Sequence, residues 1–256
     1  MTNSKRNYLI RGILRVLPVA LGCALLPGFA HGQPETLANA IDEVNRGNYA
    51  YVQQITKLAG NEKAIPILEH LFANSEDVDT KAWIASELVK LGDKDNIYCD
   101  LLVKQAREVI ESDIPSPITF DADGKAVPGQ LSPEFTAWAK AHNLSPEKQA
   151  IAAQDAVLPI KIGLLAKTGD ARAIPLLRRG LLSPNYFIEN AAAMGLVMLK
   201  DRDSIPLIVE ACKRAPSEAA SAIAMSLLQF HDPEAQRAAE PYLSKDLVKA
   251  LHEEKN

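Results

Sequence analysis

Two closely spaced carboxylates offer the most specific chemistry in the chain. Asp121 and Asp123 precede Gly124, in the pattern that opens a calcium-binding loop. Such a loop requires further oxygen ligands and a bidentate glutamate at its twelfth position, which is Ser132 in this sequence. Aspartate and glycine also favour tight turns without any metal. The segment is therefore predicted to be a turn, and no metal site is assigned to it.

A second motif has the letters of an acylase. Ser145 and Lys148 have the Ser-x-x-Lys spacing of enzymes that use the serine as a nucleophile. The partner motifs of that class, Lys-Thr-Gly and Ser-Asp-Asn, do not occur in the chain. Ser145 directly precedes Pro146, and a serine followed by proline is a typical helix start. We expect this serine to cap a helix.

The histidines do not form a metal-binding motif. Those beyond residue 32 are His70, His142, His231 and His252. None of them pair at the spacing of metal ligands on a helix. His231 occupies a turn position that Gly92 and Gly169 occupy elsewhere, which indicates a role at a helix end.

The two cysteines beyond residue 32, Cys99 and Cys212, fall on apolar positions of the pattern described below. We expect them to be buried, free thiols, too distant for a mutual disulfide. With no activating neighbour evident, neither is assigned as a nucleophile. The sequence thus predicts no catalytic residue and no cofactor.

The first 32 residues are typical of a secretory signal peptide. Residues 1–15 contain four basic residues and no acidic one, an apolar run follows over 16–26, and small residues precede possible cleavage after Ala30 or Gly32. Two alternatives are an uncleaved N-terminal anchor and a lipoprotein modified at Cys23. We expect an exported protein, periplasmic or secreted, whose mature part is residues 33–256.

Charge limits the classes of partner. The chain has 28 basic and 32 acidic residues, and without residues 1–32 the balance is 24 against 32, a net charge of −8. An acidic protein has no general attraction for nucleic acids or anionic lipids. We expect no nucleic-acid partner, and no transmembrane span in the mature chain.

The helices that would position any functional site form a pattern that recurs along the chain. Ile174-Pro175 recurs as Ile205-Pro206, 31 residues later, and Ile65-Pro66 has the same surroundings. Each unit predicts two helices with apolar stripes. In the first helix of three units, the stripes are Ile65, Leu68 and Phe72; Ile174, Leu177 and Leu181; and Ile205, Ile208 and Cys212. In the second helix of the same units, they are Ile84, Leu88 and Leu91; Ala192, Leu196 and Leu199; and Ile223, Leu227 and Phe230. The predicted helix starts are Ser132-Pro133, Ser145-Pro146, Ser183-Pro184 and Asp232-Pro233.

This pattern resembles HEAT repeats, specifically the short variety also found in phycobilisome lyases. The resemblance covers about residues 48–105 and 145–243. It implies an all-α, HEAT-like α-solenoid of about five helix pairs, in two half-stacks that flank an insert. Short HEAT units usually carry an arginine early in the second helix, but Lys81, Glu189 and Ala220 occupy that position here. The family's basic ladder is therefore missing. The alternative architecture is an irregular helical bundle.

An insert of about residues 112–144 breaks the repeat. It is rich in proline, and residues 119–127 predict a short hairpin around the Asp123-Gly124 turn. Insertions in repeat proteins often lie on the binding face. The alternative, weighed equally, is a clasp that covers the groove or the edge of the stack.

We interpret the chain as a non-catalytic scaffold that binds a protein or peptide. In this fold class, second helices line the concave side. The candidate binding residues are Lys81, Glu189, Asn190, Phe120, Asp121, Phe135 and Trp138. Phe135 and Trp138 have an alternative role in fixing the insert to the stack. The rival functions are a lyase-like protein that handles a chromophore or other small molecule, and an assembly factor of an envelope complex.

Overall fold

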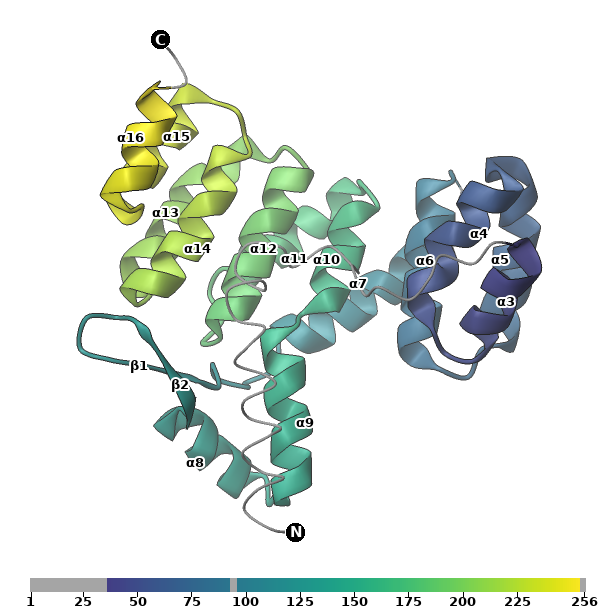
Figure 1. Ribbon diagram of the computed structural model, residues 1–256, viewed down its shortest axis with the longest axis horizontal. Helices are drawn as coiled ribbons and strands as arrows, with labels where there is room; N and C mark the ends of the chain where they lie inside the picture. The colour runs from purple at the N-terminus through teal and green to yellow at the C-terminus, as the bar shows by residue number, and fades with distance from the viewer. Residues whose placement is uncertain (1–35, 93–95, 254–256) are drawn as a thin grey trace.

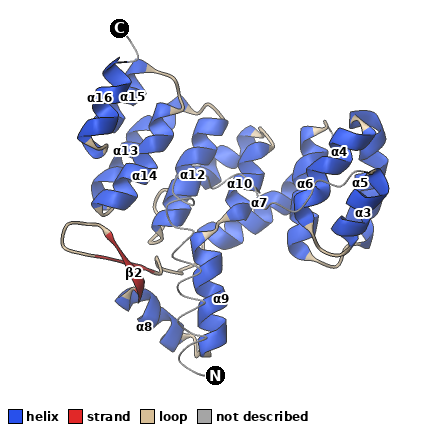
Figure 2. Cartoon of the chain, in the orientation of Figure 1, coloured by secondary structure: helices blue, strands red, loops and turns tan. Residues whose placement is uncertain are grey.

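The computed structural model describes residues 36–92 and 96–253, which form a mostly helical, all-α arrangement with one short hairpin (Figures 1 and 2). The predicted signal peptide, including Cys23, lies outside the described residues. The α-helices are α3 (Leu37–Asn45), α4 (Val52–Ala59), α5 (Asn61–Asn74), α6 (Val78–Lys90), α7 (Asn96–Ile110), α8 (Pro133–Ala141), α9 (Pro146–Val157), α10 (Ile160–Lys167), α11 (Ile174–Gly180), α12 (Tyr186–Met198), α13 (Ile205–Arg214), α14 (Ser217–Leu228), α15 (Pro233–Ala239) and α16 (Lys245–Glu253). Short 3₁₀ turns are η1 (Tyr49–Tyr51), η2 (Ala171–Ala173), η3 (Arg202–Ser204) and η4 (Glu240–Tyr242), and the strands are β1 (Ile118–Phe120) and β2 (Ala126–Leu131).

The predicted apolar stripes form the main core. Their fully buried members include Leu68, Leu177, Ile208, Ile84, Leu88, Ala192, Leu196, Ile223 and Leu227. A residue every three or four positions returns to the same side of a helix, so each stripe lies along one face. Two glycines allow close approach between helices, because a Cβ at Gly180 would lie 2.8 Å from the Cβ of Ala192 and one at Gly195 would lie 3.0 Å from Leu177 Cδ1.

Helices pack in successive pairs, and the insert interrupts one pair. The pairs in contact are α5 with α6, α7 with α10, α11 with α12, and α13 with α14, while α6, α10, α12 and α14 contact one another in that order. The insert therefore lies between the two helices of the α7–α10 pair. The two half-stacks that we expected on either side of the insert are in contact with each other, because α10 also packs on α6, where Ser86 Oγ donates a 3.2 Å hydrogen bond to the Leu164 carbonyl.

Three of the four predicted helix starts are confirmed. Ser132, Ser145 and Asp232 are N-caps whose side chains accept hydrogen bonds from the first turn. Ser183 is the exception, because α12 begins at Tyr186 and Asn185 is its N-cap. Asn185 accepts from Phe187 N and donates to the Ala156 carbonyl, both at 3.0 Å. This tertiary contact with α9 places the cap two residues later.

Left-handed turns end the second helices at equivalent positions. Gly92, Gly169, Lys200 and His231 have φ values of 88°, 73°, 57° and 50°. A residue in this conformation is the common way to end a helix, which confirms the helix-terminal role of His231.

The aspartate after each of the last three turns forms an ion pair. Arg172 lies 2.7 Å from Asp170, Arg178 lies 2.8 Å from Asp201, and Arg202 lies 3.0 Å from Asp232. The second and third pairs each join one helix pair to the next. Only the Asp201 carboxylate is buried, at 8% exposure. The other two pairs contribute little, because exposed ion pairs are weak.

The predicted hairpin of the insert is present. β1 and β2 pair antiparallel, with Ile118 opposite Leu131 and Phe120 opposite Ala126. In the turn, Asp121 Oδ1 accepts hydrogen bonds of 2.9 Å from Asp123 N and Lys125 N. Asp121 therefore stabilises the turn, as we predicted for this motif.

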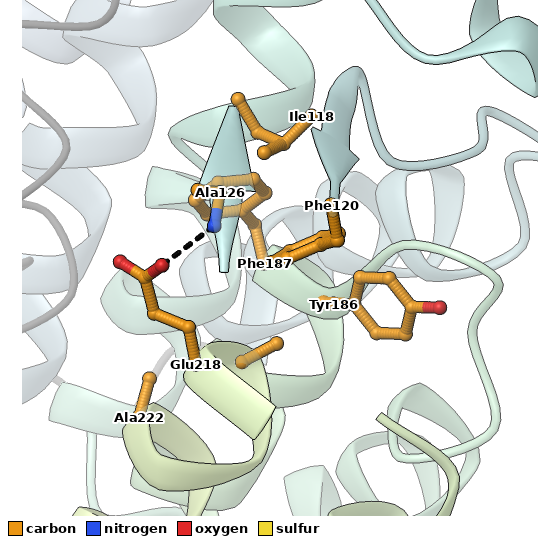
Figure 3. A pocket seen from close by; sticks show the side chains of 8 residues that line it. Ile118, Phe120, Ala126, Tyr186, Phe187, Glu218 and Ala222 are labelled. Atoms are coloured by element: carbon orange, nitrogen blue, oxygen red, sulfur yellow. Dashed lines mark hydrogen bonds between the residues drawn. The ribbon is translucent and has the colours of Figure 1, made fainter. Parts of the chain in front are cut away.

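The hairpin tip contacts the N-terminus of α14, which lies beside it in Figure 1. Ser217 Oγ donates to the Asp123 carbonyl at 2.7 Å, and Glu218 N donates to the Gly124 carbonyl at 3.0 Å. Glu218 Oε2 in turn accepts from Ala126 N at 2.7 Å (Figure 3). Pro216 provides no side-chain cap to α14, so the hairpin satisfies part of the helix end. These contacts favour the clasp interpretation of the insert.

Replacing Gly124 by alanine is expected to weaken the clasp. Gly124 has φ +74°, and a Cβ there would lie 2.5 Å from Ser217 N. The left-handed conformation alone costs alanine about 1–2 kcal/mol. Gly169→Ala is the matched control, since Gly169 has φ +73° and open space around the added atom. Urea unfolding should show a larger loss of stability for Gly124→Ala. Equal losses would mean that the tip does not press on α14.

One stretch, Pro146–Lys167, has the length and hydropathy of a membrane span. Leu158 and Pro159 interrupt it between α9 and α10. Most of α10, including Leu164 and Leu165, is buried in the main core. This burial accounts for its apolar composition, because core helices are apolar on most sides.

Candidate binding groove

A groove of about 420 Å³ lies among helices from distant parts of the chain. Its walls come from η1, α6, α7, α9, α10 and the start of α12, together with the segments that follow α7 and α9. The volume is within the range of pockets that bind small ligands or side chains, roughly 300–1,000 Å³.

The floor of the groove is apolar and aromatic. Trp83, Leu164 and Ile188 are among its lining residues, and each is at most 8% exposed. Tyr49 stacks on Trp83 with ring centroids 5.2 Å apart and planes 9° apart. Lys167 Nζ also lies 5.3 Å from the centre of the Trp83 ring. These contacts hold Trp83 in one orientation before any ligand binds.

The rim of the groove is charged. Asp79, Glu108, Asp155 and Lys161 line it, and Lys161 Nζ lies 3.3 Å from Asp79 Oδ1. The pKa of Asp155 is raised, first because surrounding protein desolvates its carboxylate and second because Asp79 repels it; Lys161 partly offsets both effects. Asp155 is nevertheless accessible to solvent. Because the groove is concave, the Asp155 carboxylate is partly desolvated by the walls around it and still open to solvent.

Lys81 points away from this groove. Its Nζ lies 5.5 Å from the centre of the Phe72 ring on α5, a cation–π contact. The neighbouring residues Asp79, Ala82 and Trp83 line the groove instead. Lys81 is therefore on the side of α6 that faces its partner helix.

Glu189 and Asn190 are not surface residues, which corrects our placement of them on an open face. They are 2% and 6% exposed, because α12 packs between α10 and α14. Glu189 Oε1 accepts a 2.8 Å bond from Arg214, while its Oε2 and the Asn190 Oδ1 are buried and have no hydrogen-bond partner among the described residues. Burial raises the pKa of Glu189 to about 7, although Arg214 opposes the shift.

The insert residues also serve packing. Phe135 is completely buried against Ala139 and Ala153, so it cannot act as an exposed anchor. Trp138 packs against Phe135, with ring centroids 5.6 Å apart, and its Nε1 donates to Asp113 at 3.0 Å. These contacts favour the alternative in which both residues fix the insert.

Phe120 lies on β1 of the hairpin, with its ring directed toward Tyr186 of α12 (Figure 3). Its ring meets the Tyr186 ring edge-on, with centroids 5.6 Å apart. Phe120 and Tyr186 line a cavity of about 10 Å³, which is roughly the space of a single water molecule. This cavity is a packing gap and too small for a ligand. Asp121, which is exposed, is engaged in the turn.

Cys99 and Cys212 are buried and free, as predicted. Cys99 Sγ donates to Asp170 Oδ2 at 3.0 Å, and burial raises its pKa to about 11. Burial likewise raises the pKa of Cys212 to about 12, with Glu189 adding to the shift. Both remain protonated at neutral pH, and a protonated thiol is a poor nucleophile.

None of the seven predicted binding residues lines the groove, and the residues that do were missed. One signal was available for Trp83. It precedes Ile84 and so lies off the apolar stripe of α6, where a large aromatic residue needs either another partner or a ligand. Nothing local marks Asp155 or Ile188, which reach the groove only through packing of distant helices.

Comparison with known proteins does not assign a family. No protein-family model, curated protein or solved structure matches the chain. Any function must therefore be argued from the groove and from the repeat pattern.

Proposed function

We propose that the protein is an exported, non-catalytic scaffold of HEAT-type helical repeats that binds a protein or peptide. Three observations support the architecture: the 31-residue recurrence, the pairwise packing of helices, and the row of second helices α6, α10, α12 and α14. Stacked units of this kind form an α-solenoid, whose curved surface is suited to extended partners.

The groove is the observation that carries the proposal. An apolar, aromatic floor inside a polar rim is the usual arrangement of a protein-binding surface. A rigid, stacked tryptophan in such a floor is a typical energetic anchor. Ile160, which is 36% exposed at the edge of the groove, extends the apolar surface toward solvent.

Binding is favoured over the lyase-like alternative by the absence of a coupled catalytic pair in the described part of the groove. General acid–base catalysis places a titrating group within hydrogen-bond reach of its partner. Asp155 titrates with a raised pKa, but no hydrogen bond joins its carboxylate to another side chain among the described residues. A carboxylate without such a partner, on a charged rim around an apolar floor, is better suited to recognition.

Site-specific photo-crosslinking tests this proposal. A benzophenone amino acid replaces Ile160 at the groove in one variant and Leu207 on α13 in the control. Both positions are exposed, at 36% and 41%. We expect polypeptide crosslinks in the envelope fraction from Ile160 and none from Leu207. Equal crosslinking from both, or a retained small molecule in the native mass with no crosslink, would contradict a protein-binding groove.

A further inference from the structure

The groove carries unmatched negative charge. Among its described lining residues, three are carboxylates (Asp79, Glu108 and Asp155) and one, Lys161, is a cation. The Asp79–Lys161 pair at 3.3 Å neutralises one charge of each sign. Within the described chain, the carboxylates of Glu108 and Asp155 take part in no hydrogen bond or ion pair. The lining side chains therefore carry a net charge of −2, or −1 when the Lys167 ammonium beside the Trp83 ring is counted.

The ionised form of Asp155 is destabilised by its surroundings in the groove. Crowding by the groove walls and repulsion from Asp79 both disfavour its ionised form, and Lys161 compensates only in part. A cationic group bound beside Asp155 would relieve that repulsion. A bound anion would increase it, so the electrostatics discriminate between partners by the sign of their charge.

We propose that the groove binds a polypeptide segment in which a lysine or arginine is flanked by apolar residues. This inference rests on the proposed function and specifies the partner's chemistry. The cationic group binds beside Asp155, and the apolar side chains cover Trp83, Leu164 and Ile188. A cation without apolar neighbours leaves the apolar floor in contact with water, and an apolar segment without a cation leaves Asp155 unpaired.

Fluorescence anisotropy with three labelled peptides tests the charge preference. The probes are Gly-Leu-Leu-Lys-Leu-Leu-Gly and the same peptide with Gln or Glu in place of Lys. With the purified full chain at low salt, we expect the Lys peptide to bind at least about tenfold more tightly than the Gln peptide, and the Glu peptide to bind most weakly. The preference should shrink at about 0.5 M salt, because salt screens accessible charges.

Two matched variants locate the preference. Asp155→Asn should reduce the advantage of Lys over Gln about tenfold, and folding should be unaffected because Asp155 is exposed and unpaired. Asp42→Asn removes the same charge from an exposed position on α3, outside the groove, and should leave the advantage unchanged. In a Trp138→Phe background, Trp83 is the only tryptophan, and its emission should change when the Lys peptide binds.

The outcomes separate this inference from the proposed function. Equal binding of the three peptides, with a change in Trp83 emission, overturns the charge preference and leaves the proposal of peptide binding intact. Equal effects of Asp155→Asn and Asp42→Asn also overturn it, because they indicate general attraction to an acidic protein. No binding by any peptide, together with equal crosslinking from Ile160 and Leu207, overturns both proposals.

Discussion

Replacing Phe135 by alanine is expected to lower the free energy of unfolding by about 3–5 kcal/mol, the usual loss for a buried phenylalanine. Phe135 is fully buried between α8 and α9, in a small cluster with Ala139 and Ala153. This cluster is separate from the main core, so the loss should fall chiefly on the insert. A partner-binding anchor on the surface would instead leave stability unchanged.

The two tryptophans of the chain allow this loss to be located. In a Trp83→Phe background, Trp138 reports on the insert; in a Trp138→Phe background, Trp83 reports on the groove. We expect Phe135→Ala to shift the urea transition seen by Trp138 more than that seen by Trp83. Thr136→Ala, at an exposed position on the same helix, should change stability by less than about 0.5 kcal/mol. Comparable effects of the two substitutions would contradict the packing role of Phe135.

Replacing Glu189 by glutamine is expected to make the protein relatively more stable as pH rises. The pKa of Glu189 is raised from 4.5 to about 7 in the folded protein, with burial as the largest cause. The folded state therefore holds this proton more tightly than the unfolded state. Its contribution to stability is fully present below pH 4.5 and is lost as pH rises through about 7. The total loss is about 3 kcal/mol, at 1.36 kcal/mol per pKa unit.

Urea unfolding of both proteins between pH 4.5 and 8.5 measures this difference. Titrations common to both cancel, so the stability of Glu189→Gln minus that of the native protein should rise across the window and then level off. The Gln Oε1 can still accept the bond that Arg214 donates to Glu189 at 2.8 Å. Glu62→Gln, an exposed position on α5, is the control for loss of a carboxylate in solvent. Parallel pH profiles for Glu189→Gln and the native protein would show that Glu189 is not the group responsible.

Features that depend on near neighbours in the chain were predictable. The apolar stripes of Leu68, Leu177 and Ile208 follow from helical periodicity, which needs no knowledge of the partner helix. The caps at Ser132, Ser145 and Asp232 depend on bonds within one helical turn. The hairpin turn around Asp121 is equally local. All of these interactions join residues at most a few positions apart.

Features that depend on which elements meet were not predictable. The helix start at Ser183 was misplaced because Asn185 bonds Ala156, 29 residues earlier. Glu189 was interpreted as a surface residue, and the role of Phe135 was left open between binding and packing, because a polar or aromatic type does not reveal which neighbour covers it. The pairing of α7 with α10 across the insert likewise has no local signal.

The sequence by itself therefore determined the repeated helix pairs, several of the helix starts and ends, and the faces that these helices bury. Only the tertiary structure decided where a ligand could bind, because Trp83, Asp155 and Ile188 line one groove from three separate helices. Periodicity reports which side of a helix avoids water, whereas a groove is the space that several packed helices leave unfilled. That space depends on the distances between helices, and these are set by side chains far apart in the chain.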